Sequence, residues 1–203
     1  MYPELCSLAL KEWAVTVRAL GLGLQILLLR KGGIRELGKH FQLMRNEFLL
    51  YPTFEHQQND LVKADHRDIF TTEISTPPFQ GTVMFSSWAR VEAILNLEDI
   101  NSLASLYPFH IWTSDYAEKR FHWKPKRPLT VMMIRTYHME MPQIVQYYDS
   151  YGGCKSWVEL VDRIPLGQLT PAVPDEDFEN TMSNIKHILP RAEIMPISDM
   201  GNL

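Results

Sequence analysis

Two long segments with strand character constrain the fold of this chain more than any other feature of its sequence. In residues 83–95 apolar side chains occupy alternate positions with charged residues between them: Ala89, Val91, Ala93 and Leu95 against Arg90 and Glu92. Residues 129–139 form the clearest long strand. A period of two is typical of a strand with one face on a core. We therefore expect each of these two segments to contribute a strand.

The remaining segments predict short elements. We expect shorter strands at 25–29, 41–44, 48–51 and 109–112, and helices at 8–20, 54–66, 97–106 and 175–189. Residues 156–161 are expected to form a short element whose type is left open. The order of these elements lacks the regular alternation of strand and helix that gives a doubly wound parallel sheet. The expected fold class is α+β, with a curled, mostly antiparallel sheet or small barrel and short helices.

Composition divides the 203 residues into two parts. Residues 1–165 carry dense apolar periodicity and are expected to form a single α+β domain. Residues 166–203 are expected to form a proline-punctuated appendage with one short helix, since prolines interrupt regular structure. Prolines stand at 165, 171, 174, 190 and 196.

Charge and cysteine content limit the classes of partner. The net charge of -4 gives no overall attraction to nucleic acid or to an anionic membrane, so such affinity needs a local patch. No run of about 18 apolar residues is present to span a bilayer. The two cysteines, Cys6 and Cys154, are too few for a disulfide framework. A cytoplasmic protein without membrane partners is expected, and its protein partners are left open.

Four longer motifs carry a resemblance to a known family. They are "ALKEWAV" at 9–15, "ILLLRKGGIRE" at 26–36, "FLLYPTFEHQ" at 48–57 and "YGGCKSWVEL" at 151–160. Together they resemble a bacterial family, common in cyanobacteria, known as domain of unknown function 1802. The resemblance spans about residues 8–160, with the tail beyond Pro165 outside it. It implies no activity, because the family has no assigned function.

A second resemblance concerns architecture. An expected helix, a glycine and a strand ending in Arg30-Lys31 look similar to the opening of the ASCH branch of the PUA-like barrels, which often bind RNA or modified bases. The strand "LTVMMIRTYHMEMP" at 129–142 is similar to the last strand of such domains. The usual glycine-lysine-threonine-glutamate pattern is absent here, and residues 23–26 read Gly-Leu-Gln-Ile. The resemblance implies a PUA-like fold, and a fold alone does not imply a function.

The glycine pair at 32–33 is flanked by cations. Arg30, Lys31 and Arg35 could hold an anion there, because glycines let backbone N–H groups approach an oxyanion and arginine offers two parallel donors. The alternative is a solvated hairpin turn. The Walker spacing of a nucleotide-binding loop is missing.

A second candidate group follows the strand at 48–51. Thr53 is expected to cap a helix, and His56 and Gln57 lie in its first turn. His56 is the candidate catalytic acid–base residue, although its neighbour Glu55 points about 100° away around a helix and cannot pair with it. The alternative is that His56 only caps the helix. If the strands before Arg30 and Thr53 pair, both groups lie on one rim.

The strongest local charge feature lies in residues 118–128, "EKRFHWKPKRP". Cations alternating with rings are typical of surfaces that bind single-stranded nucleic acid, with phosphates on the cations and bases on the rings. The candidate binding residues are Lys119, Arg120, Trp123, Lys124, Lys126 and Arg127. The alternative is a polar β-hairpin whose aromatic side chains face the core.

Neither a metal nor a cofactor is expected, because no HExxH or paired CxxC spacing is present. Cys154 is either a nucleophile beside Lys155 or a buried structural residue. The favoured function is a binding module for RNA, single-stranded DNA or a modified base. The alternatives are an enzyme acting on a phosphorylated or nucleotide substrate, and an interaction protein that uses the helix at 175–189. Whether the chain is catalytic is left open.

Overall fold

The computed structural model describes residues 2–31, 46–55, 58–69, 81–97, 99–125, 127–189 and 193–195. The strands are β1 (Leu5–Trp13), β2 (Leu27–Arg30), β3 (Glu47–Thr53), β4 (Thr82–Leu97), β5 (Leu129–Gln146), β6 (Trp157–Pro165), β7 (Leu169–Pro171) and β8 (Glu193–Met195). The helices are α1 (Ala14–Gly21), α3 (Ile100–Ser105), α4 (Ser114–His122) and α5 (Asp175–Ile188). Single turns of 3-10 helix are η1 (Asn59–Leu61), η2 (Ala64–His66), η3 (Tyr107–Phe109) and η4 (Asp149–Tyr151).

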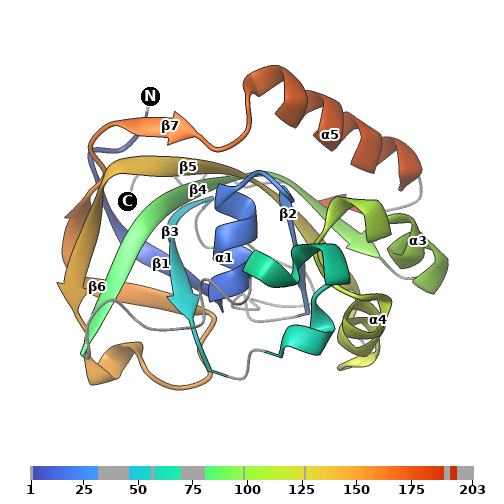
Figure 1. Ribbon diagram of the computed structural model, residues 1–203, viewed down its shortest axis with the longest axis horizontal. Helices are drawn as coiled ribbons and strands as arrows, with labels where there is room; N and C mark the ends of the chain where they lie inside the picture. Colours follow the sequence, from blue (N-terminus) through green and yellow to red (C-terminus); the bar gives the residue numbers. More distant parts are fainter. Residues whose placement is uncertain are drawn as a thin grey trace.

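The strands form one curled sheet in the order β2-β5-β4-β3-β1-β6, with β7 added to β5 and β8 to β4. Among the pairings in the described residues, β1 with β3 is parallel and the others are antiparallel. Figure 1 shows β4 and β5 running side by side across the whole molecule. The predicted α+β class with a curled, mostly antiparallel sheet is confirmed.

The largest continuous ladder joins the two segments that the sequence singles out. β4 and β5 pair from Thr82 opposite Gln146 to Leu97 opposite Leu129, with irregular register after Phe85 and after Val91. Such bulges increase the local twist of a strand, and therefore help a long ladder to curl. Helix α1 packs on the inner side of the curl, where Val17 and Leu20 join apolar side chains from β1 to β5.

The expected helix at 8–20 is correct only in its second half. Residues 5–13 form β1, which pairs with β3 on one side and β6 on the other, and α1 begins at Ala14. Leu10 and Ala9 are both fully buried, so apolar side chains cover both faces of this strand. A doubly buried strand has no clear period of two, and its spacing is easily read as helical.

The helix expected at 54–66 is also wrong. The described part of this segment contains η1 and η2, joined through Val62, whose backbone bridges to Trp112. Lys63 donates its backbone N–H to the Ile111 carbonyl, at 2.9 Å. These long-range hydrogen bonds replace the local ones that a continuous helix would make. None of the helices in the described ranges is long and apolar enough to cross a bilayer.

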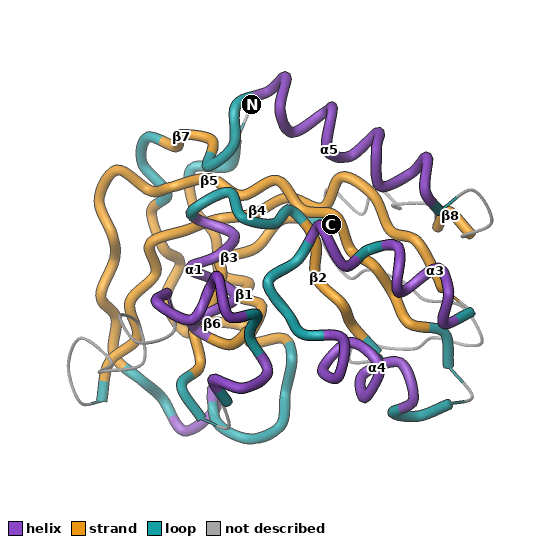
Figure 2. The backbone as a smooth tube through the Cα atoms, turned by 45° about the vertical axis from the view of Figure 1, so that its right-hand side comes forward, coloured by secondary structure: helices purple, strands orange, loops and turns teal. Residues whose placement is uncertain are grey.

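Residues 166–189 pack against the sheet. β7 pairs with β5, and the expected helix is present as α5, which Figure 2 shows along the outside of the strands. Its Phe178 and Ile185 are buried in an apolar cluster with side chains from β2, β4 and β5. Arg135 of β5 pairs with Asp175 and stacks on the Phe178 ring, with its guanidinium carbon 4.7 Å from the ring centroid. Whether residues 1–165 fold without this segment stays a prediction.

The substitution Phe178→Ala tests how strongly α5 contributes to the folded state. Phe178 is 1% exposed, and truncating a buried phenylalanine typically lowers the free energy of unfolding by about 3–5 kcal/mol. The neighbouring substitution Glu179→Ala, on the exposed side of α5, is the control and should change it by less than about 0.5 kcal/mol. Equal urea midpoints for both variants would contradict the expected role of α5 and favour an independent domain at 1–165.

His110 is a buried histidine between η3 and α4. Its Nδ1 accepts the Trp112 backbone N–H at 3.2 Å, while its Nε2 has no hydrogen-bond partner within the described ranges. Burial, reinforced by the nearby Lys63 ammonium, lowers the pKa of His110 from 6.5 to about 4. The folded protein therefore holds this imidazole in its neutral form.

We predict that this histidine makes stability fall as pH falls. Between pH 6.5 and about 4, His110 is protonated in the unfolded chain but neutral in the folded protein. The free energy of unfolding therefore decreases as the pH falls through this window. The full shift corresponds to roughly 3 kcal/mol. The variant His110→Asn keeps an acceptor for the Trp112 N–H but cannot titrate, so its stability should depend less on pH. Parallel pH profiles for the two proteins, measured by urea unfolding, would contradict this assignment.

Candidate functional site

Arg30 ends β2 and lies inside the protein. It is 6% exposed, and its guanidinium pairs with the Glu12 carboxylate at the end of β1. The Thr53 hydroxyl donates to the Glu12 backbone carbonyl at 3.0 Å. Glu12 thus joins the ends of three strands, with its side chain on Arg30 and its main chain on Thr53.

Arg30 and Thr53 both contact Glu12, but the strand pairing that brings them there differs from the expected one. β2 pairs with β5 and β3 pairs with β1 and β4, so the direct pairing of β2 with β3 is wrong. The two residues come together because the sheet curls and brings the end of β1 against β2. Arg35, His56 and Gln57 lie outside the described residues. A shared anion site on this rim stays a prediction, and Arg30 would have to exchange its Glu12 partner to take part.

Lys31 connects the end of β2 to α4. Its ammonium donates to the Phe121 backbone carbonyl and lies 4.9 Å from the Phe121 ring centroid. Arg120 Nε donates to the Leu29 carbonyl at 3.3 Å, which adds a second connection. Burial lowers the pKa of the Lys31 ammonium, and the carbonyl and ring stabilise its charged form.

The segment 118–128 is not a β-hairpin. It contains the end of α4, whose first turn is capped by Thr113: the hydroxyl accepts the Tyr116 backbone N–H. Threonine is a favoured cap, so this start is readable in the sequence. Lys124 follows α4 with φ of 51°, in the left-handed region that costs a side-chain-bearing residue about 1–2 kcal/mol. The chain then turns toward β5.

The basic residues at the end of α4 and just after it form a surface that we call the α4 basic surface: Lys119, Arg120, Trp123, Lys124 and Arg127. Lys31 is buried, 3% exposed, and contacts this segment through Phe121. Trp123 is 50% exposed, and the Lys124 ammonium lies 4.2 Å from its ring centroid. A cavity of about 240 Å³ opens beside it, lined in part by Lys31, His122 and Arg127. Lys126 lies outside the described residues.

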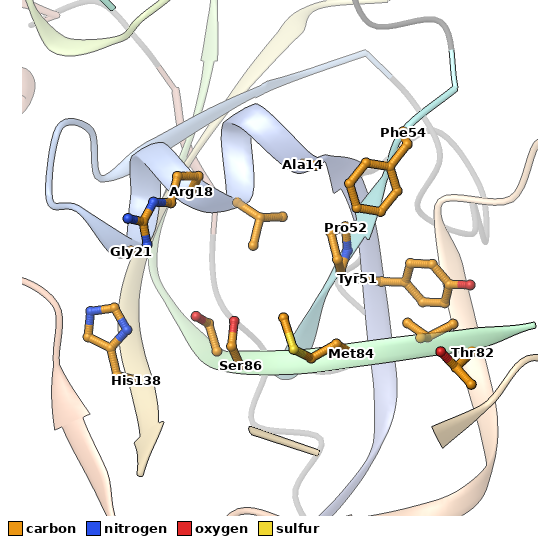
Figure 3. Close-up of a pocket in the computed structure, with 13 residues that line it drawn as sticks. Ala14, Arg18, Gly21, Tyr51, Pro52, Phe54, Thr82, Met84, Ser86 and His138 are labelled. Atoms are coloured by element: carbon orange, nitrogen blue, oxygen red, sulfur yellow. The ribbon is translucent and has the colours of Figure 1, made fainter. Parts of the chain in front are cut away.

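A larger cavity, which we call the α1 pocket, lies at the opposite end of the β4–β5 ladder. It has a volume of about 360 Å³ between α1, the end of β3 and the first half of β4 (Figure 3). No acidic residue is among the described residues that line it. Its polar side chains are those of Arg18, Tyr51, Thr82, Ser86, Ser87 and His138.

Sequence reasoning missed Arg18, Ser86 and His138. Arg18 is a single exposed cation on α1, and Ser86 and His138 lie in strands whose apolar residues dominate the pattern. Only the sheet register, which places His138 opposite Ser87, brings them together. Residues that converge across four elements leave no local signal.

Metal binding and nucleophilic catalysis have little support among the described residues. The described ranges contain no group of three or more His, Cys, Asp or Glu side chains that could hold a metal ion. Cys154 is exposed rather than buried. Lys11 lies near it, and donates to the Tyr151 carbonyl. A nucleophilic role for Cys154 stays a prediction.

The chain belongs to the family described as a domain of unknown function, DUF1802, whose model matches residues 9–184. The match includes β7 and most of α5, so the expectation that the resemblance ends before Pro165 is wrong. No curated protein matches the chain.

Two solved structures of single-residue variants of ZmASCH from Zymomonas mobilis are similar to the chain. The first shares 14% identity and covers 90% of this chain and 98% of its own, and the second shares 13% identity and covers 87% and 96%. Both have a TM-score of 0.41.

The buried pair of Glu12 and Arg30 generates a stability prediction. Glu12→Ala leaves a buried guanidinium without its partner, which typically costs about 3–5 kcal/mol of unfolding free energy. The double variant Glu12→Leu/Arg30→Met removes both charges and should recover most of that loss, because well-packed apolar replacements of buried pairs are often neutral. Urea unfolding of the two variants measures this. A single variant as stable as the starting protein would contradict a structural role for the pair.

Proposed function

We propose that this member of the family binds single-stranded nucleic acid, RNA or DNA, through the α4 basic surface. The observation that carries the proposal is the half-exposed ring of Trp123, which lies 4.2 Å from the Lys124 ammonium and close in the chain to the exposed Lys119 and Arg127. Proteins that bind single strands combine a positive surface for the phosphates with aromatic side chains for the bases.

The supports for this proposal are local. The chain as a whole is acidic, with a net charge of -4, so affinity for a polyanion depends on a surface such as this one. The Arg120 side chain is held by the Leu29 backbone carbonyl, which limits the conformational freedom that binding would cost. Lys119 precedes Trp123 in the chain and Lys124 follows it. Both side chains are exposed and can reach phosphates.

The alternative enzyme has weaker support. It requires Arg30 and Lys31 to hold a substrate anion while His56 transfers a proton. Arg30 is paired with Glu12, and Lys31 donates to the Phe121 carbonyl. His56 lies outside the described residues, so no described contact favours this alternative over binding.

Fluorescence anisotropy with a labelled single-stranded oligonucleotide tests the proposed function. Each phosphate neutralised contributes roughly -0.7 to the slope of log affinity against log salt, so three or four engaged cations give a slope of about -2 to -3. Lys119→Gln should reduce the magnitude of that slope by about 0.7. Arg163→Gln, which removes an exposed cation from β6, is the charge-matched control and should leave the slope unchanged.

Trp123→Ala separates stacking from charge in the same assay. Loss of one base–ring stack should weaken binding by about 1–3 kcal/mol and leave the salt slope nearly unchanged. Because the ring is half exposed, the melting temperature should change little. Tyr148→Ala, at an exposed ring outside this surface, is the aromatic control. Binding that is absent at low salt, or equally affected by both aromatic variants, would contradict the proposal.

A further inference from the structure

The α1 pocket has two chemically different ends. Figure 3 shows the Arg18 guanidinium and the His138 imidazole on the Gly21 side, with Phe54 and Tyr51 on the other. Ser86 and Met84 lie between them on β4. The pocket is separated from the α4 basic surface by about ten residues of β4, roughly 30 Å of strand. Its chemistry is therefore independent of that surface.

The cationic end is built from three elements. Arg18 comes from α1, and His138 of β5 lies opposite the buried Ser87 of β4 in the sheet register. A Cβ on Gly21 would stand 3.3 Å from His138 Cε1, so the absence of a side chain there lets the imidazole pack against the helix. A guanidinium, an imidazole and hydroxyl groups are donors suited to an oxyanion, and the described lining contains no carboxylate to compete.

The other end suits a flat ring with a polar edge. Phe54, Pro52 and Met84 provide apolar contact surface. The Tyr51 phenol also lines this end. Burial, with the neighbouring Tyr147 and Tyr151 phenols, raises the pKa of Tyr51 to about 12. It therefore remains protonated at neutral pH and keeps an O–H that can donate.

The two ends together define the class of ligand. An inorganic anion would contact only the cationic end, and a hydrocarbon ring would make no hydrogen bond with the hydroxyl groups of Ser86 and Tyr51. A neutral nucleoside would leave Arg18 and His138 unused. A ring with hydrogen-bonding edges attached to a phosphate satisfies both ends, and about 360 Å³ lies in the usual range of small-molecule sites.

We propose that the α1 pocket binds a nucleoside monophosphate unit, with the phosphate at Arg18 and His138 and the base between Phe54 and Met84. The unit is either a free nucleotide or the 5′-phosphorylated end of a strand. The proposal does not depend on strand binding by the α4 basic surface, because none of the residues of that surface lines the pocket.

Isothermal titration calorimetry of the full chain with adenosine 5′-monophosphate as the probe tests this site. Removing one charge-assisted contact, as in Arg18→Gln, should weaken binding about ten- to a hundredfold. Arg163→Gln is the control outside the pocket and should leave the affinity unchanged. Arg18 is an exposed residue of α1, and melting curves establish that each variant is folded. Adenosine should bind more weakly than the monophosphate to the starting protein, and equally to both arginine variants.

Two further arms complete the test. Ser86→Phe places a ring in the middle of the pocket and should abolish binding, whereas Lys119→Gln on the α4 basic surface should not affect it. Displacement of the bound monophosphate by a 5′-phosphorylated oligonucleotide, but not by its unphosphorylated counterpart, assigns the site to strand ends. Retention of the monophosphate assigns it to the free nucleotide. No binding to the folded starting protein, or an affinity unchanged by Ser86→Phe, would overturn the proposal.

Discussion

The pairing of β4 with β5 is the constraint on which the rest of the structure depends. Their ladder is the longest in the sheet, and the other strands are added to one or other of its sides. Because the ladder curls, its inner side receives α1. Because it runs from Thr82 to Leu97, its two ends lie far apart. The α1 pocket occupies one end, at Ser86 and His138, and the α4 basic surface occupies the other, near Leu97.

Two ion pairs connect elements that do not pair with each other in the sheet. The Glu12–Arg30 pair connects the end of β1 to the end of β2, which lie far apart in the strand order. The Arg135–Asp175 pair fastens the first turn of α5 to the middle of β5. A buried ion pair contributes little net stability but is costly to break, so its effect is mainly to favour one arrangement of the elements. In this chain the Glu12–Arg30 pair is of this kind, whereas the Asp175 carboxylate of the second pair is exposed.

The sequence predicted the class of fold because most of the strands carry their own apolar pattern. The patterns of residues 83–95 and 129–139 predicted the strands β4 and β5 but not their pairing, and the acids at 175–177 indicated the start of α5. β1 was misread as helix because both its faces are buried. The segment near Val62 was misread because its hydrogen bonds come from residues almost fifty positions away.

The candidate sites also differ in how much of each could be predicted from the sequence. The α4 basic surface was predictable in part, because its cations and Trp123 are adjacent in the chain. The contact of Lys31 with this segment was not, since it requires β2 to end beside Phe121. Arg30 looked like a ligand-binding residue, and only the curl of the sheet shows its buried partner, Glu12. The α1 pocket had no sequence signal, because its polar residues meet through sheet register alone.

The most direct test of the central claim is photo-cross-linking of the full chain to a single-stranded oligonucleotide, followed by mass spectrometry of the adducts. Short-range photochemistry reports which side chains touch the bases, independently of changes in affinity. The account predicts adducts on Trp123, the half-exposed ring that follows α4. Adducts confined to residues outside 114–128, with none on the α4 basic surface, would contradict it.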